Sequence, residues 1–149
     1  MKLTNRDLRL LKLLASYGFL STSQIVKFVF DSIATTTTLR RLRLLEEARL
    51  LKRVIGLESQ ELLWIVTAAG ARYAKVSAPK SKWSKNMLEH DHKLVSLRIA
   101  LEASGVSYSW TPEHEIRSFI FKKHGFKGIK ERIVPDALIG IDANGLKFA

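Results

Sequence analysis

Hydrophobic residues recur at helical spacing along the first fifty residues of the chain. The first stripe comprises Leu8, Leu11 and Leu14. Thr4 precedes this stripe as a capping residue, and Asp7 has the spacing to close the capping box. Gly18 follows the stripe. This pattern predicts one amphipathic helix. The sequence Ser21-Thr22-Ser23-Gln24 is a second capping box, and an apolar run follows it. We therefore expect a second helix directly after the first.

A third helix is expected from about Thr35 to Ala48. At about 100° per residue, a buried face centred on Leu42 includes Thr38, Leu39, Leu45 and Arg49. The opposite face carries Thr36, Thr37, Arg40 and Leu44, with Arg41 and Arg43 at its flanks. The exposed side of this helix is therefore rich in hydroxyl and guanidinium groups.

Two apolar runs, residues 50–55 and 62–66, flank a polar turn and predict a β-hairpin. A short helix is expected from Thr67 to about Val76. Three helices followed by two strands in this order are typical of a winged helix-turn-helix domain. We assign that domain to residues 1–76.

Residues 77–86 are polar and basic and contain a proline, so they are interpreted as a linker. Residues 87–149 follow with a different pattern. We expect a helix from about Met87 to Ala103 that ends at Gly105, and strands at 106–110, 116–121 and 133–141, the last interrupted near its start by a proline. Residues 124–130 are interpreted as a loop, and Ala143-Asn144-Gly145 as a hairpin turn into a final strand. The predicted fold class is α+β.

Charge adds a functional indication to this pattern. The 149 residues include 25 Lys and Arg against 14 Asp and Glu, a net charge of +11. Residues 1–55 hold 11 − 4 = +7 of that excess. Such a balance favours a polyanionic partner, above all nucleic acid.

There is no cysteine, which excludes disulfides and thiolate sites. No apolar run reaches the roughly 20 residues of a membrane span, and no signal peptide is evident, so we expect a cytoplasmic protein without a membrane partner.

The third helix is the expected reader of double-stranded DNA. Small hydroxyl side chains allow a close approach to the major groove, and arginine binds guanine or phosphate. The predicted turn between the strands holds Glu58 and Glu61 and no basic residue, so phosphate contacts are expected from the base of the strands. The predicted DNA-binding residues are Thr35, Thr36, Thr37, Arg40, Arg41, Arg43, Lys52 and Arg53. Leu44 on the outer face indicates cover by another element or a dimer contact, so a homodimer is left open.

Several short motifs follow one another along the chain. In order, they are Leu3-Thr4-x-Arg6-Asp7, Phe19-Leu20-Ser21-Thr22, Arg40-Arg41-Leu42-Arg43-x-Leu45, Ala48-x-Leu50-Leu51, Thr67-x-Ala69-Gly70, His90-Asp91 and Pro135-Asp136-Ala137. With these motifs in this order, the chain resembles the replication-relaxation proteins of plasmids and other mobile elements. The resemblance implies a winged helix that serves replication, mobilisation or their transcriptional control. Arg49 stands where that pattern usually has glycine, so a left-handed backbone is expected there.

The second segment, with Pro135-Asp136 in its sheet region, resembles the core of PD-(D/E)XK nucleases. Asp136 is the first metal ligand that this resemblance implies, with Glu89 or Glu102 assisting. The next strand, however, would have to supply an acid and a lysine, and the chain reaches residue 149 before it is complete. We therefore expect an incomplete nuclease-like segment without activity. The alternative is a metal-dependent nuclease completed beyond residue 149.

No cofactor or further catalytic site is predicted. His90, Asp91 and His92 are consecutive, so on a helix they point about 100° apart and do not converge on a metal. There is no nucleophile elbow and no glycine-rich phosphate loop. A third interpretation makes the second half a docking module, with Trp83, Trp110 and residues 119–121 as contacts.

Overall fold

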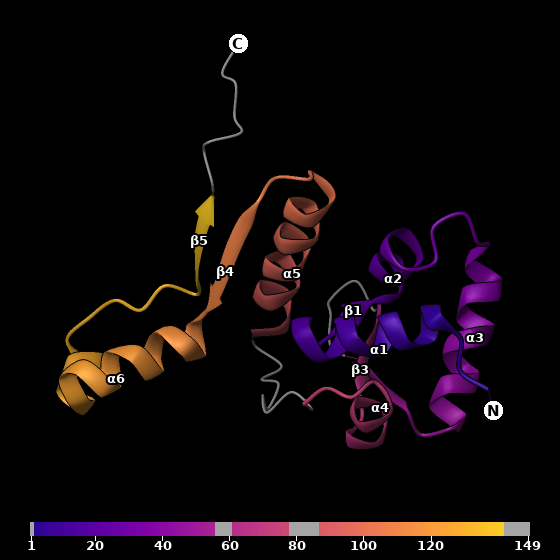
Figure 1. Ribbon diagram of the computed structural model, residues 1–149, viewed down its shortest axis with the longest axis horizontal. Helices are drawn as coiled ribbons and strands as arrows, with labels where there is room; N and C mark the ends of the chain where they lie inside the picture. The colour runs from indigo at the N-terminus through magenta and orange to yellow at the C-terminus, as the bar shows by residue number, and fades with distance from the viewer. Residues whose placement is uncertain (1, 56–60, 78–86, 142–149) are drawn as a thin grey trace, which may run out of the picture. The chain divides into compact units, whose positions relative to one another are not determined.

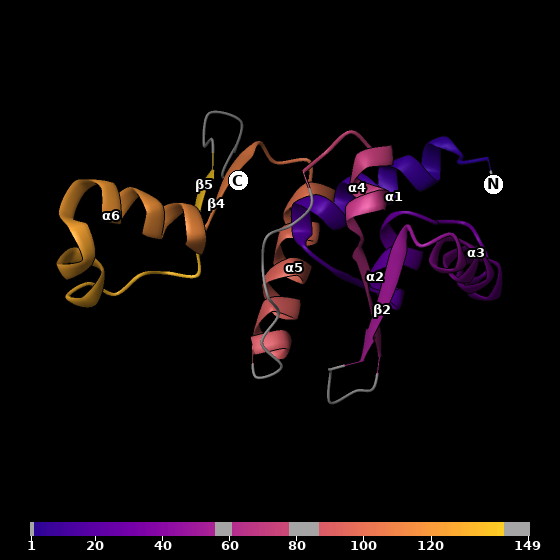
Figure 2. The ribbon, with the colours of Figure 1, turned by 90° about the horizontal axis from the view of Figure 1, so that it is seen from below.

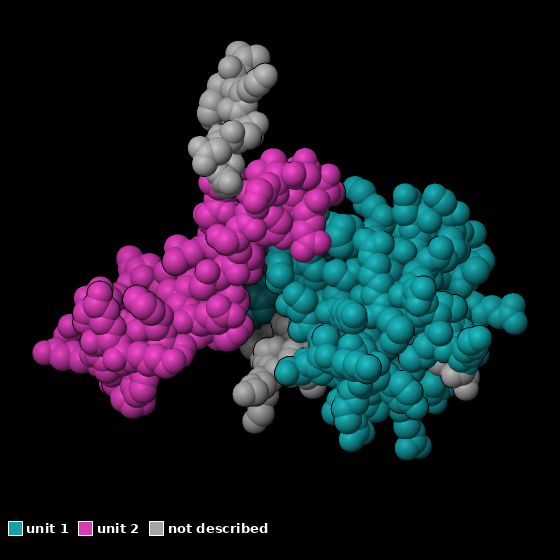
Figure 3. Space-filling model, in the orientation of Figure 1, with its two compact units in different colours: residues 1–99 teal, residues 100–149 magenta. Residues whose placement is uncertain are grey.

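A computed structural model describes residues 2–55, 61–77 and 87–141, and helices with small antiparallel sheets give these residues an α+β fold (Figure 1). The chain divides into two compact units, residues 1–99 and 100–149 (Figure 3). The predicted linker falls almost entirely on residues 78–86, and the predicted hairpin turn after residue 142 falls on 142–149. Both segments lie outside the described residues.

Three helices open the first unit, and the first two start with the predicted capping chemistry. These helices are α1 (Asn5–Tyr17), α2 (Thr22–Phe28) and α3 (Thr35–Glu47). Thr4 and Asp7 form a reciprocal capping box on α1, and Ser21 and Gln24 form another on α2. Gly18 ends α1 with φ of +87°, a conformation that glycine adopts without strain.

A three-stranded antiparallel sheet completes this helical core. Its strands are β1 (Leu20–Ser21), β2 (Leu51–Ile55, seen in Figure 2) and β3 (Leu62–Val66), in the order β1-β3-β2. Trp64 of β3 pairs with Leu20 on one side and Arg53 on the other. The Trp64 indole N–H donates to the Thr22 hydroxyl at 3.0 Å, which ties the sheet to the start of α2.

The turn from α3 into the sheet depends on backbone geometry. Arg49 has φ of +59°, as predicted from its place at a turn where glycine is usual. After β3 comes α4 (Ala68–Tyr73), capped by Thr67. The Thr67 hydroxyl also donates to the Arg49 carbonyl at 2.7 Å. A Cβ added to Gly70 would collide with the Leu50 carbonyl, so only glycine allows α4 to lie this close to the start of β2.

The core of the first unit draws on every one of these helices and on the next one, α5 (Leu88–Ala103). Leu88 and Val95, seven residues apart on one face of α5, are buried in the same cluster as Leu10, Leu14 and Trp64. Across this contact the Gln24 amide donates to the Ser96 hydroxyl at 2.8 Å. The first three turns of α5 therefore belong to the N-terminal unit, whereas the sequence pattern assigned this helix to the second segment.

The second unit contains the end of α5, then β4 (Tyr108–Pro112), α6 (Glu113–Lys130) and β5 (Ala137–Ile141). The two strands pair antiparallel, with Trp110 opposite Ile139. The strand predicted at 116–121 and the loop predicted at 124–130 are both wrong, because these residues form α6. Two acidic residues in its first turn and an Arg117–Glu113 pair at i, i+4 favour the helix, which kinks at Gly125 with φ of +65°.

This correction changes the predicted order of the second segment. Within the described residues it is helix, strand, helix, strand, and not a helix followed by three strands. Ile116 is the one large apolar side chain of residues 100–141 that is buried. The exposed apolar side chains of this unit are Phe119, Phe121, Phe126, Ile133, Leu138, Ile139 and Ile141. Among the described helices, none has the length and apolar character needed to cross a membrane.

Candidate nucleic-acid interface

The two faces of α3 are those that the sequence pattern predicts, except that Arg49, expected on the buried face, lies beyond the end of the helix and is exposed. Thr38, Leu42 and Leu45 are fully buried. The exposed residues of the helix are Thr35, Thr36, Thr37, Arg40, Arg43, Leu44 and Glu47. Thr36, Arg40, Arg43 and Glu47 follow one another at intervals of four, three and four residues, so they form a single stripe along the outer side of the helix.

The start of α3 leaves polar groups available to a ligand. Ala34 occupies the N-cap position and offers no side-chain hydrogen bond. The first backbone N–H groups of the helix therefore lack the side-chain acceptor that caps α1 and α2. Because these N–H groups carry the positive end of the helix dipole, this end of α3 attracts negative charge.

Arg40 and Arg43 are exposed on this stripe and make no hydrogen bond or ion pair with any described residue. Their guanidinium groups therefore keep all their donors for a ligand. Arginine offers five donors in a planar arrangement that matches both phosphate and the O6/N7 edge of guanine. These two side chains are the centre of the candidate interface.

Arg41, which the sequence assigned to DNA, is held inside the protein. Its Nε donates to Asp7 Oδ1 at 2.9 Å and its Nη2 to Asp7 Oδ2 at 2.5 Å. Asp7 is only 1% exposed. Burial raises the pKa of Asp7, but hydrogen bonds from Arg41 and Thr4 outweigh that effect and lower it overall. We therefore remove Arg41 from the candidate interface, since it pins α1 to α3.

The phosphate contacts expected of the two basic residues of β2 stay a prediction, and the structure shows where each residue lies. The Arg53 Nε donates to Glu46 Oε1 at 2.9 Å, so its charge is already paired with an acid of α3. Lys52 is exposed but projects from the opposite face of the strand. Val54 projects from that same face and, with Leu88 of α5, lines a small gap. Neither residue joins the stripe on α3.

Two basic residues that sequence reasoning missed lie beside α3. The Lys2 carbonyl accepts a hydrogen bond from Arg41 Nη2 at 3.2 Å. The Arg6 guanidinium lies 5.5 Å above the centre of the Phe30 ring, in the segment that leads into α3. Both side chains are exposed. No local sequence signal marks these two residues, because their position beside α3 depends on contacts between segments far apart in the chain.

Glu61, which appeared as an unfavourable charge on the hairpin, has a structural role. Its carboxylate accepts the Ser23 backbone N–H at 2.7 Å at the start of α2. Burial raises the pKa of Glu61, but hydrogen bonds from Ser23 and Ser21 and the neighbouring His92 lower it overall. The His92 ring also stacks on Phe19 with centroids 6.5 Å apart. Glu61 therefore stabilises the junction of α2, the hairpin and α5. Glu58 lies outside the described residues.

The predicted metal ligand Asp136 lies just before β5, where its backbone carbonyl accepts the Glu113 N–H at 2.9 Å. Glu102 accepts a hydrogen bond from the Tyr108 hydroxyl at 3.1 Å. Among the described residues, no three His, Asp or Glu side chains gather as a metal-binding group. His90 pairs with its neighbour Asp91 at 3.2 Å. Within the described residues, Asp136 therefore belongs to no such group of three side chains.

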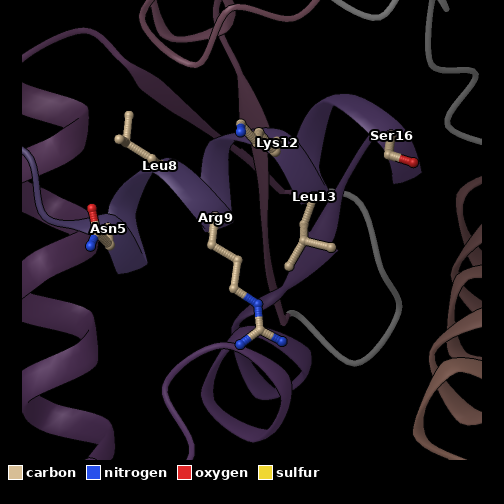
Figure 4. A pocket seen from close by; sticks show the side chains of 6 residues that line it. All are labelled: Asn5, Leu8, Arg9, Lys12, Leu13 and Ser16. Carbon is tan, nitrogen blue, oxygen red and sulfur yellow. The ribbon is translucent and has the colours of Figure 1, made fainter. Parts of the chain in front are cut away.

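A shallow hollow runs along the outer face of α1 (Figure 4). Its lining is Asn5, Leu8, Arg9, Lys12, Leu13 and Ser16. All six residues come from one helix, so the hollow is an open helix face and no second element closes it. The lining contains no acid, and Arg9 lies 5.8 Å from the centre of the Phe28 ring of α2. This set of side chains does not form a catalytic site.

Comparisons of the chain with protein-family models, curated proteins and solved structures found no match.

Proposed function

We propose that residues 1–99 form a winged helix-turn-helix unit that binds double-stranded DNA, with α3 in the major groove. The order α1-β1-α2-α3-β2-β3 and the sheet order β1-β3-β2 support this proposal, because winged helices use that arrangement. The observation that carries it is the outer stripe of α3. There, Thr36, Arg40 and Arg43 project outward, and both arginines lack a partner among the described residues.

The distribution of charge supports the same partner. Residues 1–99 contain 18 basic and 8 acidic residues, a net charge of +10, and residues 100–149 contain 7 and 6, a net charge of +1. The whole-chain excess of +11 is therefore almost entirely in the unit that carries α3. A concentration of positive charge of this size attracts DNA phosphates and increases the rate of association.

The acidic residue at the end of α3 indicates which part of the helix enters the groove. Glu47 ends the outer stripe, and a carboxylate there would repel the phosphates that border the groove. The part of α3 before Glu46 and Glu47 has the exposed threonines, Arg40, Arg43 and the positive end of the helix dipole. We therefore place Thr36, Thr37, Arg40 and Arg43 against the bases, with Lys2 and Arg6 on the adjacent phosphates.

The resemblance to replication-relaxation proteins extends the proposal to a biological setting. It supports a role in the replication, transfer or transcriptional control of a plasmid or another mobile element. We propose that the chain binds DNA and does not cleave it.

The test compares Arg40→Ala with Arg72→Ala, which removes the same charge from an exposed position on α4. A preferred duplex is first selected from random DNA with the wild-type protein, and Kd is then measured by fluorescence anisotropy. Loss of a bidentate base contact should weaken binding to the preferred duplex by about 10- to 100-fold, and binding to a random duplex by much less. Arg72→Ala should change neither Kd by more than about threefold. An Arg40→Ala protein that keeps the full preference would refute the role of α3.

A further inference from the structure

Leu44 is an apolar side chain on the polar outer side of α3. It is 41% exposed, whereas Leu42 and Leu45 on the same helix are fully buried. It belongs neither to the buried core nor to the partly buried residues that pack against that core. The fold therefore does not use Leu44 for its own stability within the described residues.

Its position relative to the arginines is defined by the helix. Leu44 follows Arg40 by four residues, so the two side chains are about 40° apart around the axis and about 6 Å apart along it. Adjacent base pairs of DNA are separated by about 3.4 Å, so Leu44 would face a base pair one or two steps from the one that Arg40 contacts. Glu47, three residues further on, marks the end of the part of α3 that suits DNA.

In the major groove at that distance, only one of the four bases offers a favourable contact to a branched apolar side chain. Guanine, cytosine and adenine present hydrogen-bonding groups in the major groove, and thymine adds a C5 methyl group. A leucine cannot pair with the first three bases, and it would remove their polar edges from water without compensation. Against thymine, the same side chain buries a methyl group.

We propose that Leu44 is a specificity-determining residue that contacts a thymine C5 methyl group in the major groove, next to a guanine bound by Arg40. This inference rests on the proposed DNA-binding function. It names the substrate more closely, as a duplex whose preferred site places thymine one or two base pairs from that guanine.

The experiment is a double-mutant cycle between the protein and the DNA. In the selected duplex, each thymine of the site is replaced in turn by uracil, which lacks only the C5 methyl group. Kd is then measured for the wild-type protein and for Leu44→Ala. At one position, the replacement should weaken binding of the wild-type protein by about three- to fivefold, as expected for one buried methyl group, and should leave binding of Leu44→Ala unchanged.

Leu97→Ala is the matched control, because Leu97 is a 45% exposed leucine on α5. This variant should respond to uracil as the wild-type protein does. Circular dichroism and the melting temperature check that Leu44→Ala folds. The inference is overturned if the selected site has no thymine, if uracil has no effect on the wild-type protein, or if uracil weakens both proteins equally. Failure of the wild-type protein to bind any duplex would instead refute the proposed function itself.

Discussion

At the scale of single residues, the arginines of α3 divide into two groups that the sequence alone does not separate. Arg40 and Arg43 project outward, and Arg41 forms a two-point ion pair with the buried Asp7. Asp7 serves two purposes, since its carboxylate also accepts the Thr4 backbone N–H at 2.7 Å. The capping role of Asp7 was predictable from its spacing to Thr4. Its partner 34 residues away was not.

This pair predicts how stability depends on pH. Because the folded state holds the pKa of Asp7 below its ordinary value, the stabilisation is present at neutral pH and is lost as the pH falls below about 4. Asp7→Asn keeps the size of the side chain and removes its charge. We expect it to lower the free energy of unfolding at pH 7 by about 2 kcal/mol.

Urea denaturation between pH 7 and pH 3 measures this effect. Wild-type stability should fall towards pH 3 more steeply than that of Asp7→Asn, so the two curves converge in acid. Glu47→Gln, at an exposed position on α3, is the control and should keep the wild-type slope. Parallel curves for the wild-type protein and Asp7→Asn would show that the Asp7–Arg41 ion pair is not the source of the loss of stability in acid.

At the scale of elements, α5 has a different role from the one that the sequence pattern indicated. Leu88 and Val95 bury one face of it in the first unit, and Arg98 contacts Ser16 at the end of α1, with its Nη2 3.1 Å from the hydroxyl. The Arg98 guanidinium also lies 4.3 Å from the centre of the Tyr17 ring. The core of the DNA-binding unit that we propose therefore includes a further helix, α5, beyond the hairpin and α4.

Two leucines of α5 test this assignment. Leu88 is 3% exposed and Leu97 is 45% exposed. Leu88→Ala removes buried methyl and methylene groups and should lower the free energy of unfolding by about 2–3 kcal/mol. Leu97→Ala should change it by less than about 0.5 kcal/mol. The measurement is urea denaturation followed by tryptophan fluorescence, with Trp83 and Trp110 replaced by phenylalanine in every protein compared, so that the signal comes from Trp64, which is buried in the first unit. Equal effects of the two substitutions would exclude a core role for the start of α5.

At the scale of the whole molecule, the two units differ in their net charge and in how much apolar surface they bury. The first unit carries +10 of the +11 net charge and buries a large core. The second unit carries +1 and buries Ile116 alone among its described large apolar side chains. If the chain binds DNA as we propose, we therefore expect the binding to depend on the first unit.

The dependence of binding on salt follows from this distribution. If about five phosphates are neutralised, log K should fall against log salt with a slope of about −4.5. Arg6→Ala should weaken binding to every duplex alike and reduce the slope by about one. Arg117→Ala, in the second unit and already paired with Glu113, should leave the slope unchanged. A wild-type slope near zero would be inconsistent with duplex DNA as the main partner.

Local chemistry by itself determined most of the first unit. Capping boxes, helical periodicity and the glycine after α1 depend on residues within four positions of one another, so α1, α2, α3 and the hairpin could be predicted. The outward stripe of α3 could be predicted for the same reason. The left-handed turn at Arg49 was also expected, on the resemblance to a family in which glycine is usual there.

Only the tertiary structure decided the contacts between distant segments. The partner of Arg41, the attachment of α5 to the first unit and the pairing of β4 with β5 each join residues far apart in the chain, and no local pattern encodes those distances. The helix at 113–130 was missed because residues 119–121 are a short run of aromatic and β-branched side chains, a composition that favours a strand. The spacing of Glu113 and Arg117 could be read from the sequence, but only the pairing of β4 with β5 shows that residues 113–130 connect two strands and are not a strand themselves.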